Sequence, residues 1–121
     1  MAGTIVADQL QDGAGNSTSM DNAIYGSAKA WVRFNGSAAT ITSSYNVSSI
    51  TKVGSGNFTV NFTNAFADAN YNAVGMFQDN TWQGCLGASP TYTTTTFRTT
   101  TIAIPSGTQV DSTNVSISFF R

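Results

Sequence analysis

Apolar and polar side chains alternate along several short segments of this chain, and such alternation indicates strands that bury one face. The pattern is plainest near the end of the sequence, where single serines separate Val115, Ile117 and Phe119. We predict that this segment is a strand with these three side chains facing inward. Because the sequence runs only two residues beyond Phe119, its last residues are predicted to lie in a sheet.

The clearest local signal is a hairpin in the middle of the chain. Residues 58–62 read Phe-Thr-Val-Asn-Phe, which again alternates apolar and polar positions. They follow the glycine-rich residues 54–57, which are typical of a turn, and the extended segment 49–53. A turn of this kind between two strand-like segments predicts a β-hairpin.

Four further segments have the character of strands, and turn signals recur along the chain at spacings of about 8 to 12 residues. The last of the four is rich in threonine and is predicted to form one long strand or two. With the hairpin and the final strand, the chain has about seven or eight short strands, a number typical of an antiparallel β-sandwich. The four segments are residues 28–34, 40–47, 71–77 and 91–104.

The segment 28–34 carries bulky side chains on both of its faces. Ala30, Val32 and Phe34 share one face, and Trp31 and Arg33 share the other. Strands that are covered on both sides have this character. We therefore expect both faces to be covered, with Trp31 in the core or in a contact between subunits.

The chain divides into an arm and a domain. Residues 1–26 are predicted to form an extended N-terminal arm, because residues 11–19 are small, polar and glycine-rich, although residues 4–7 could add one short strand. Residues 27–121 form the predicted sandwich. Ile5, Val6 and Leu10 are candidate residues for docking the arm on a neighbouring subunit. A frayed terminus is the alternative interpretation of the arm.

Composition narrows the classes of function. Only 9% of the residues are charged, against about a quarter in an average protein. The net charge is −1, and the five basic residues form no run, so nucleic acid is not an expected partner. The hydrophobic share of 40% is enough for a core. A surface with so few charges is poorly protected against self-association, which favours a protein covered by copies of itself or by partners.

The chain offers little to catalysis or to metals. Histidine is absent, so a serine or cysteine nucleophile lacks its usual base. Glutamate is also absent, and the six aspartates lie in the arm or in predicted turns, where they are expected to cap backbone amides. Cys85 is the only cysteine, which excludes an intrachain disulfide and a thiolate zinc site, and it is expected to be a buried, inert thiol. We expect no enzyme, no cofactor and no metal.

One predicted loop could bind carbohydrate. Trp82 is flanked by Asp79, Asn80 and Gln83, an aromatic ring among groups that can bond sugar hydroxyls. The alternative is that Trp82 packs against the sheet edge. Residues 1–8 show no signal peptide, and no apolar run reaches the roughly 20 residues of a membrane span. We therefore expect synthesis in the cytoplasm and no membrane insertion.

Several segments resemble, in order and spacing, a module common in tail-fibre-like proteins of bacteriophages, especially marine and cyanobacterial ones. The resemblance is strong over residues 26–74, weaker at the start and faint after Trp82. The resemblance implies no catalytic residue at any position of this chain. The segments are residues 1–8, 26–36 (Gly-Ser-Ala-Lys-Ala-Trp-Val-Arg-Phe-Asn-Gly), 44–51, 54–56, 58–62 and 68–71.

The resemblance implies a β-rich structural protein of the virion, often a homotrimer, made in the cytoplasm of a host bacterium. Its implied partners are itself and other virion proteins of the tail or capsid, with a host surface glycan as a further candidate. Most fibres are long, and this chain has room only for an arm and one domain. A capsid decoration or head-fibre protein, clamped to the shell by its arm, is therefore an alternative. A carbohydrate-binding module is the alternative from another class.

Overall fold

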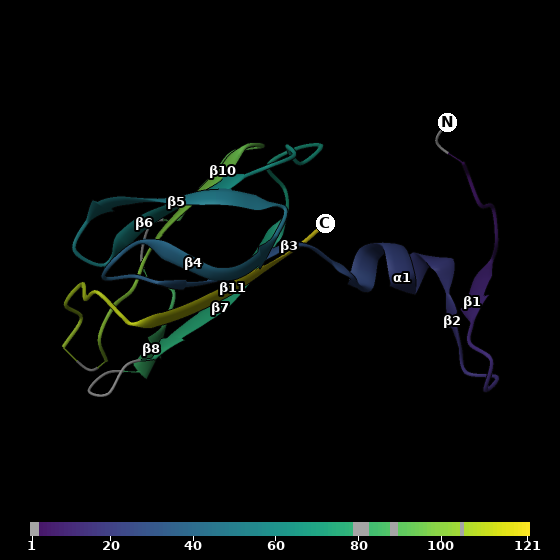
Figure 1. The fold of residues 1–121 in the computed structure, drawn as a ribbon, viewed down its shortest axis with the longest axis horizontal. Coiled ribbons are helices and arrows are strands. Elements are labelled where there is room, and N and C mark those ends of the chain that lie inside the picture. The colour runs from purple at the N-terminus through teal and green to yellow at the C-terminus, as the bar shows by residue number, and fades with distance from the viewer. Residues whose placement is uncertain (1–2, 79–82, 88–89, 105) are drawn as a thin grey trace.

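A computed structural model describes residues 3–78, 83–87, 90–104 and 106–121 of the chain. Two antiparallel sheets face each other, and a helix followed by a small hairpin leads away from them (Figure 1). This arrangement confirms the prediction of an all-β, antiparallel sandwich. In the part of the chain described, no helix is long and apolar enough to cross a membrane.

The larger sheet has five strands, and every neighbouring pair is antiparallel. Its central strand is the C-terminal one, so the last residues of the sequence do lie in the sheet, as predicted. In spatial order the strands are β4 (Thr40–Tyr45), β3 (Ala28–Asn35), β11 (Asn114–Phe120), β7 (Asn72–Gln78) and β8 (Gln83–Cys85).

The smaller sheet has four strands and contains the predicted hairpin, now seen as β5 paired with β6. The threonine-rich segment forms two strands, one of the two predicted outcomes. In spatial order the strands are β5 (Val47–Gly54), β6 (Asn57–Phe62), β10 (Thr96–Thr100) and β9 (Thr91–Tyr92).

The core lies between the two sheets and follows the alternation in the sequence. Val115, Ile117 and Phe119 are each at most 2% exposed, which confirms that they face inward. Phe119 pairs across strands with Ala30 and Ala73, and these small neighbours leave room for its ring. Its ring, on the larger sheet, is surrounded by four aromatic rings from the smaller sheet and from the connection between β6 and β7, namely Phe62, Phe66, Tyr71 and Phe97.

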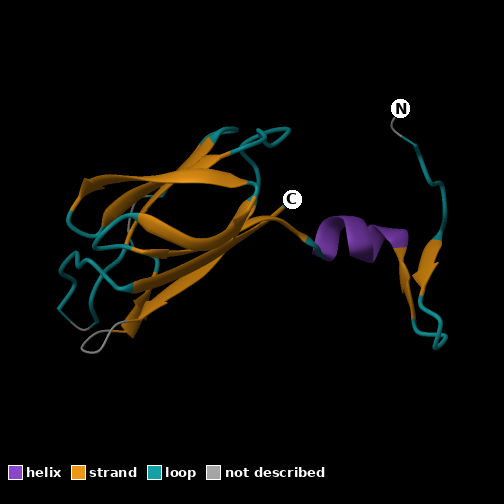
Figure 2. Ribbon diagram, viewed as in Figure 1, coloured by secondary structure: helices purple, strands orange, loops and turns teal. Residues whose placement is uncertain are grey.

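The outer face of β3 differs from the sequence-based expectation. Trp31 is 39% exposed and Arg33 is also exposed, so nothing in the described chain covers this face. The interpretation of Trp31 as a core residue is therefore wrong, and its role in a contact between subunits stays a prediction. The reason is geometric: the smaller sheet packs on one side of the larger sheet only (Figure 2).

The arm also differs from an extended segment. It contains a hairpin of β1 (Gln9–Gln11) and β2 (Ser17–Ser19), followed directly by the helix α1 (Met20–Gly26). Residues 4–7, which could have added a strand, lie outside any strand. Ser19 caps the helix by accepting a hydrogen bond from the backbone nitrogen of Asn22 at 3.2 Å. Asp21 in the first turn adds a favourable charge at the N-terminal end of the helix.

Gly56 is required in the turn between β5 and β6. Its φ is +59°, and a Cβ atom there would lie 2.5 Å from the backbone nitrogen of Val110. We predict that Gly56→Ala lowers the free energy of unfolding by about 2 kcal/mol or more, because strain and a backbone clash add together. Gly54→Ala is the matched control, since a Cβ at Gly54 meets nothing within 4 Å. Urea unfolding of both variants measures the difference, and equal costs would contradict the prediction.

Tyr71 provides a second test, based on its buried hydroxyl. This hydroxyl lies 3.1 Å from the carbonyl oxygen of Thr93 and 3.0 Å from that of Thr96, to which it donates. Tyr71→Phe should cost about 1 kcal/mol at neutral pH, the usual net value of such a bond. Urea unfolding at pH 7 measures this cost.

Burial also raises the pKa of Tyr71 to about 12, so the folded state favours the neutral phenol. The stabilisation that comes from keeping this phenol neutral in the folded state is fully present below the ordinary pKa of about 10. It is lost as the pH rises toward 12. The free energy of unfolding of the native chain should therefore fall more steeply over this range than that of Tyr71→Phe. Identical pH profiles for the two proteins would refute this expectation.

Candidate functional site

The three arm residues proposed for docking are all open to solvent. Ile5 is 83% exposed, Val6 is 93% exposed and Leu10 is 49% exposed. Ile5 and Val6 precede β1, and Leu10 lies within it. The structure thus places these side chains along one end of the arm without burying any of them. Their role in docking stays a prediction.

The helix α1 adds to the apolar surface of the arm. None of its residues is buried, and Ile24 and Tyr25 are 47% and 64% exposed. An isolated helix of this length is unstable in water unless tertiary contacts support it. Two hydrogen bonds fix its ends, the Ser19 cap and the bond from Ser27 Oγ to the carbonyl oxygen of Ala23. These local bonds do not supply an apolar core.

Asp12 holds the turn of the arm hairpin. Its Oδ1 accepts hydrogen bonds from the backbone nitrogens of Ala14 and Asn16, each at 2.9 Å. Its Oδ2 accepts from the side-chain amide of Asn16, and this bond is the main reason that the pKa of Asp12 lies below its ordinary value. Asp68 and Asp111 likewise accept from the backbone nitrogens of Asn70 and Gly56. These three aspartates confirm the expectation of backbone caps in turns.

A second apolar surface, which the sequence did not single out, covers the outer face of the larger sheet. The outward side of the larger sheet is the outer face, and it carries four exposed apolar side chains on three strands beside Arg33, Ser116 and Ser118. Trp31 pairs with Tyr45 on one side and with Ser118 on the other, and Ser118 in turn pairs with Val74. The exposed fractions of its four apolar residues are 39% for Trp31, 58% for Tyr45, 56% for Val74 and 67% for Met76.

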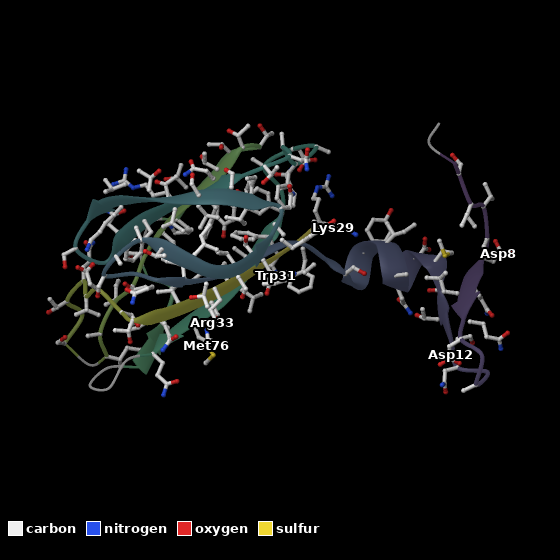
Figure 3. All side chains as sticks on the ribbon, in the orientation of Figure 1. Asp8, Asp12, Lys29, Trp31, Arg33 and Met76 are labelled. Atoms are coloured by element: carbon white, nitrogen blue, oxygen red, sulfur yellow. The ribbon has the colours of Figure 1, made fainter. Side chains whose placement is uncertain are left out.

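A hollow of about 370 Å³ lies at one end of this face. Arg33, Met76, Asn114 and Ser116 contribute to its lining. The guanidinium of Arg33 donates a hydrogen bond to Oδ1 of Asn114 at 3.0 Å, so a neutral amide is its partner there. Figure 3 shows Trp31, Arg33 and Met76 together on the side of the larger sheet that is turned away from the smaller sheet.

Charge is unevenly distributed between the arm and the domain. Residues 3–26 contain three aspartates and no basic residue, whereas all five basic residues follow residue 26. Within the described chain, two of these form ion pairs: Lys52 with Asp111 at 2.6 Å, and Arg121 with Asp68. The remaining three, Lys29, Arg33 and Arg98, have no carboxylate partner among the described residues.

The loop proposed to bind carbohydrate cannot be compared with the structure. Asp79, Asn80 and Trp82 lie outside the described residues, and Gln83 is the first residue of β8. Cys85 is the last residue of β8, and its side chain is also outside those described. The proposals for Trp82 and for an inert thiol therefore stay predictions.

A sequence signal for the outer face did exist. In β7 the outward positions are occupied by Val74 and Met76, which alternate with Ala73, Gly75 and Phe77 on the inner side. An apolar residue at almost every position obscures which side is exposed. Only the pairing of β7 with β11, and of β11 with β3, brings Val74 and Met76 onto the face that carries Trp31.

Among the described residues, no group of three or more potential metal ligands gathers in one place. The features that stand out are instead two exposed apolar surfaces, one on the arm and one on the outer face. No family model, curated protein or solved structure matches this chain.

Proposed function

We propose that this chain is a structural subunit of a bacteriophage virion, a homo-oligomer on the surface of the tail or the capsid. In this proposal the arm anchors the subunit and the sandwich projects outward, where it can contribute to host attachment. The subunit is made in the host bacterium and is found in the virion. The resemblance of residues 26–74 to the tail-fibre-like module supports the phage assignment.

The observation that carries the proposal is the exposed apolar arm. Ile5, Val6 and Leu10 together with Ile24 of α1 present apolar surface that nothing in the described chain covers. Apolar surface costs roughly 25 cal/mol per Å² when left in water, so an arm of this kind gains stability by docking on another subunit.

Tail and capsid positions are distinguished by copy number. A tail element is present in few copies and a capsid decoration in many copies per particle. Quantitative mass spectrometry of purified particles would separate the two positions. Absence of the chain from the particles would contradict the proposal as a whole.

The arm also provides a test with purified protein. We expect light scattering to give an oligomer, with three times the chain mass as the leading expectation. Replacing both Ile5 and Val6 by serine should shift the chain to a monomer, because the arm then loses its most exposed apolar side chains. Val53→Ser is the matched control: this valine is 51% exposed on β5, and its loss should leave the oligomer intact. A native chain that is monomeric at all concentrations would oppose the proposal.

A further inference from the structure

The arm and the outer face carry complementary side chains, although they belong to parts of the chain that lie apart. We propose that the arm of one copy docks on the outer face of the larger sheet of a neighbouring copy. This inference rests on the proposed function, since it names the surface that receives the arm in the oligomer. It concerns the described residues of the arm, 3–26, and the outer face, whose exposed apolar residues are Trp31, Tyr45, Val74 and Met76.

The first support is apolar complementarity. Each of the two surfaces exposes several large apolar side chains, and neither has a partner in the described chain. On the outer face, Ser116 and Ser118 of the central strand separate Trp31 and Arg33 on β3 from Val74 and Met76 on β7. Because these serine side chains are small, the surface along β11 forms a shallow groove between the larger side chains of β3 and β7. Residues 3–7 of the arm lie outside any strand and are one chain wide, so they fit this shape better than a second flat sheet does.

The second support is charge complementarity. The arm contains only acidic charges, and Asp8 makes no side-chain hydrogen bond or ion pair within the described chain. The outer face contains Arg33, which has a neutral partner, and Lys29 lies at the end of the same strand nearest the arm (Figure 3). An arginine beside a hollow is suited to a carboxylate, because its planar group can donate two parallel hydrogen bonds. Asp8 follows Val6 by two residues, so in the proposed contact Val6 lies against the apolar side chains of the outer face and Asp8 lies beside Arg33.

The third support is the direction of the arm. The helix α1 leads away from the sandwich and carries the hairpin of β1 and β2 to its far end (Figure 1). Seven helical residues span about 10 Å, so the hairpin stands clear of the sheets of its own chain. An arm held in this direction is available to a neighbour.

The contact joins two different surfaces, the arm of one copy and the outer face of another, and this limits the symmetry of the oligomer. The surface given by each copy differs from the surface it receives, so the contact can run head to tail and close as a ring, or it can be made twice in a dimer whose copies exchange arms. A ring of three copies agrees with the trimer of the proposed function.

Mixing two variants tests this arrangement directly. Val6→Asp damages the arm alone and Met76→Asp damages the outer face alone; at 93% and 67% exposure neither change should affect folding, which thermal unfolding would check. We expect each variant to be monomeric by itself. Mixed in equal amounts, they should form a one-to-one complex, because the intact arm of Met76→Asp can dock on the intact face of Val6→Asp. A face-to-face contact between two sheets would give no complex on mixing and would overturn the inference.

Charge reversal gives an independent readout by sedimentation at low salt. Asp8→Arg and Arg33→Glu should each weaken association about tenfold, and the double variant should recover most of the loss. Arg98→Glu is the matched control, since Arg98 is an exposed arginine of the smaller sheet that also bonds a neutral asparagine, Asn57. Equal loss in the control, or no recovery in the double variant, would count against a contact between Asp8 and Arg33.

The outcomes separate this inference from the proposed function. If the native chain is an oligomer that Met76→Asp and Arg33→Glu leave intact, the arm docks elsewhere and only the inference fails. If the native chain is a monomer and absent from particles, the proposed function fails as well. A third outcome is that the native chain is a monomer that binds immobilised glycans, and that the Trp31→Ala variant no longer binds them. The outer face would then be a carbohydrate-binding surface, and the inference would be overturned.

Discussion

The packing of Phe119 between the two sheets is the contact on which the structure most depends. Its ring is fully buried and lies within 6.5 Å, centre to centre, of the rings of Phe62, Phe66, Tyr71 and Phe97. These four rings come from the smaller sheet and from the connection between β6 and β7, whereas Phe119 itself belongs to the larger sheet. Edge-on aromatic contacts of this kind stabilise beyond the area they bury. Phe119 therefore joins the last strand of the sequence to segments from the whole domain.

This core sets the boundary between the domain and the arm. Every buried apolar residue in the described chain lies between Ala30 and Phe119, and none comes from the hairpin or from α1. The sandwich is thus complete without the arm, whereas the arm has only local hydrogen bonds and its caps. The apolar side chains that the arm leaves exposed are the ones that the proposed docking on a neighbouring subunit would cover.

The scarcity of charge gives the few charged groups distinct positions. Lys52 and Arg121 are paired with aspartates at the edges of the sandwich, where they fix turns and the C-terminus. The acidic arm and the arginine on the outer face have no such partners within the described chain. The proposed contact between copies would bring these separated charges of opposite sign together.

The sequence by itself determined the strands and the inner side of most of them, because alternation is a property of neighbouring residues. Val115, Ile117 and Phe119, the hairpin across residues 54–57 and the local caps by Asp12 and Asp68 all followed from local pattern. The helix α1 was missed although Ser19 and Asp21 are a local signal for its start. Only the tertiary structure decided that Trp31 is exposed and that Tyr45 and Val74 share its face. Exposure depends on which strands pair and on which side the second sheet packs, and both are set by contacts between residues far apart in the chain.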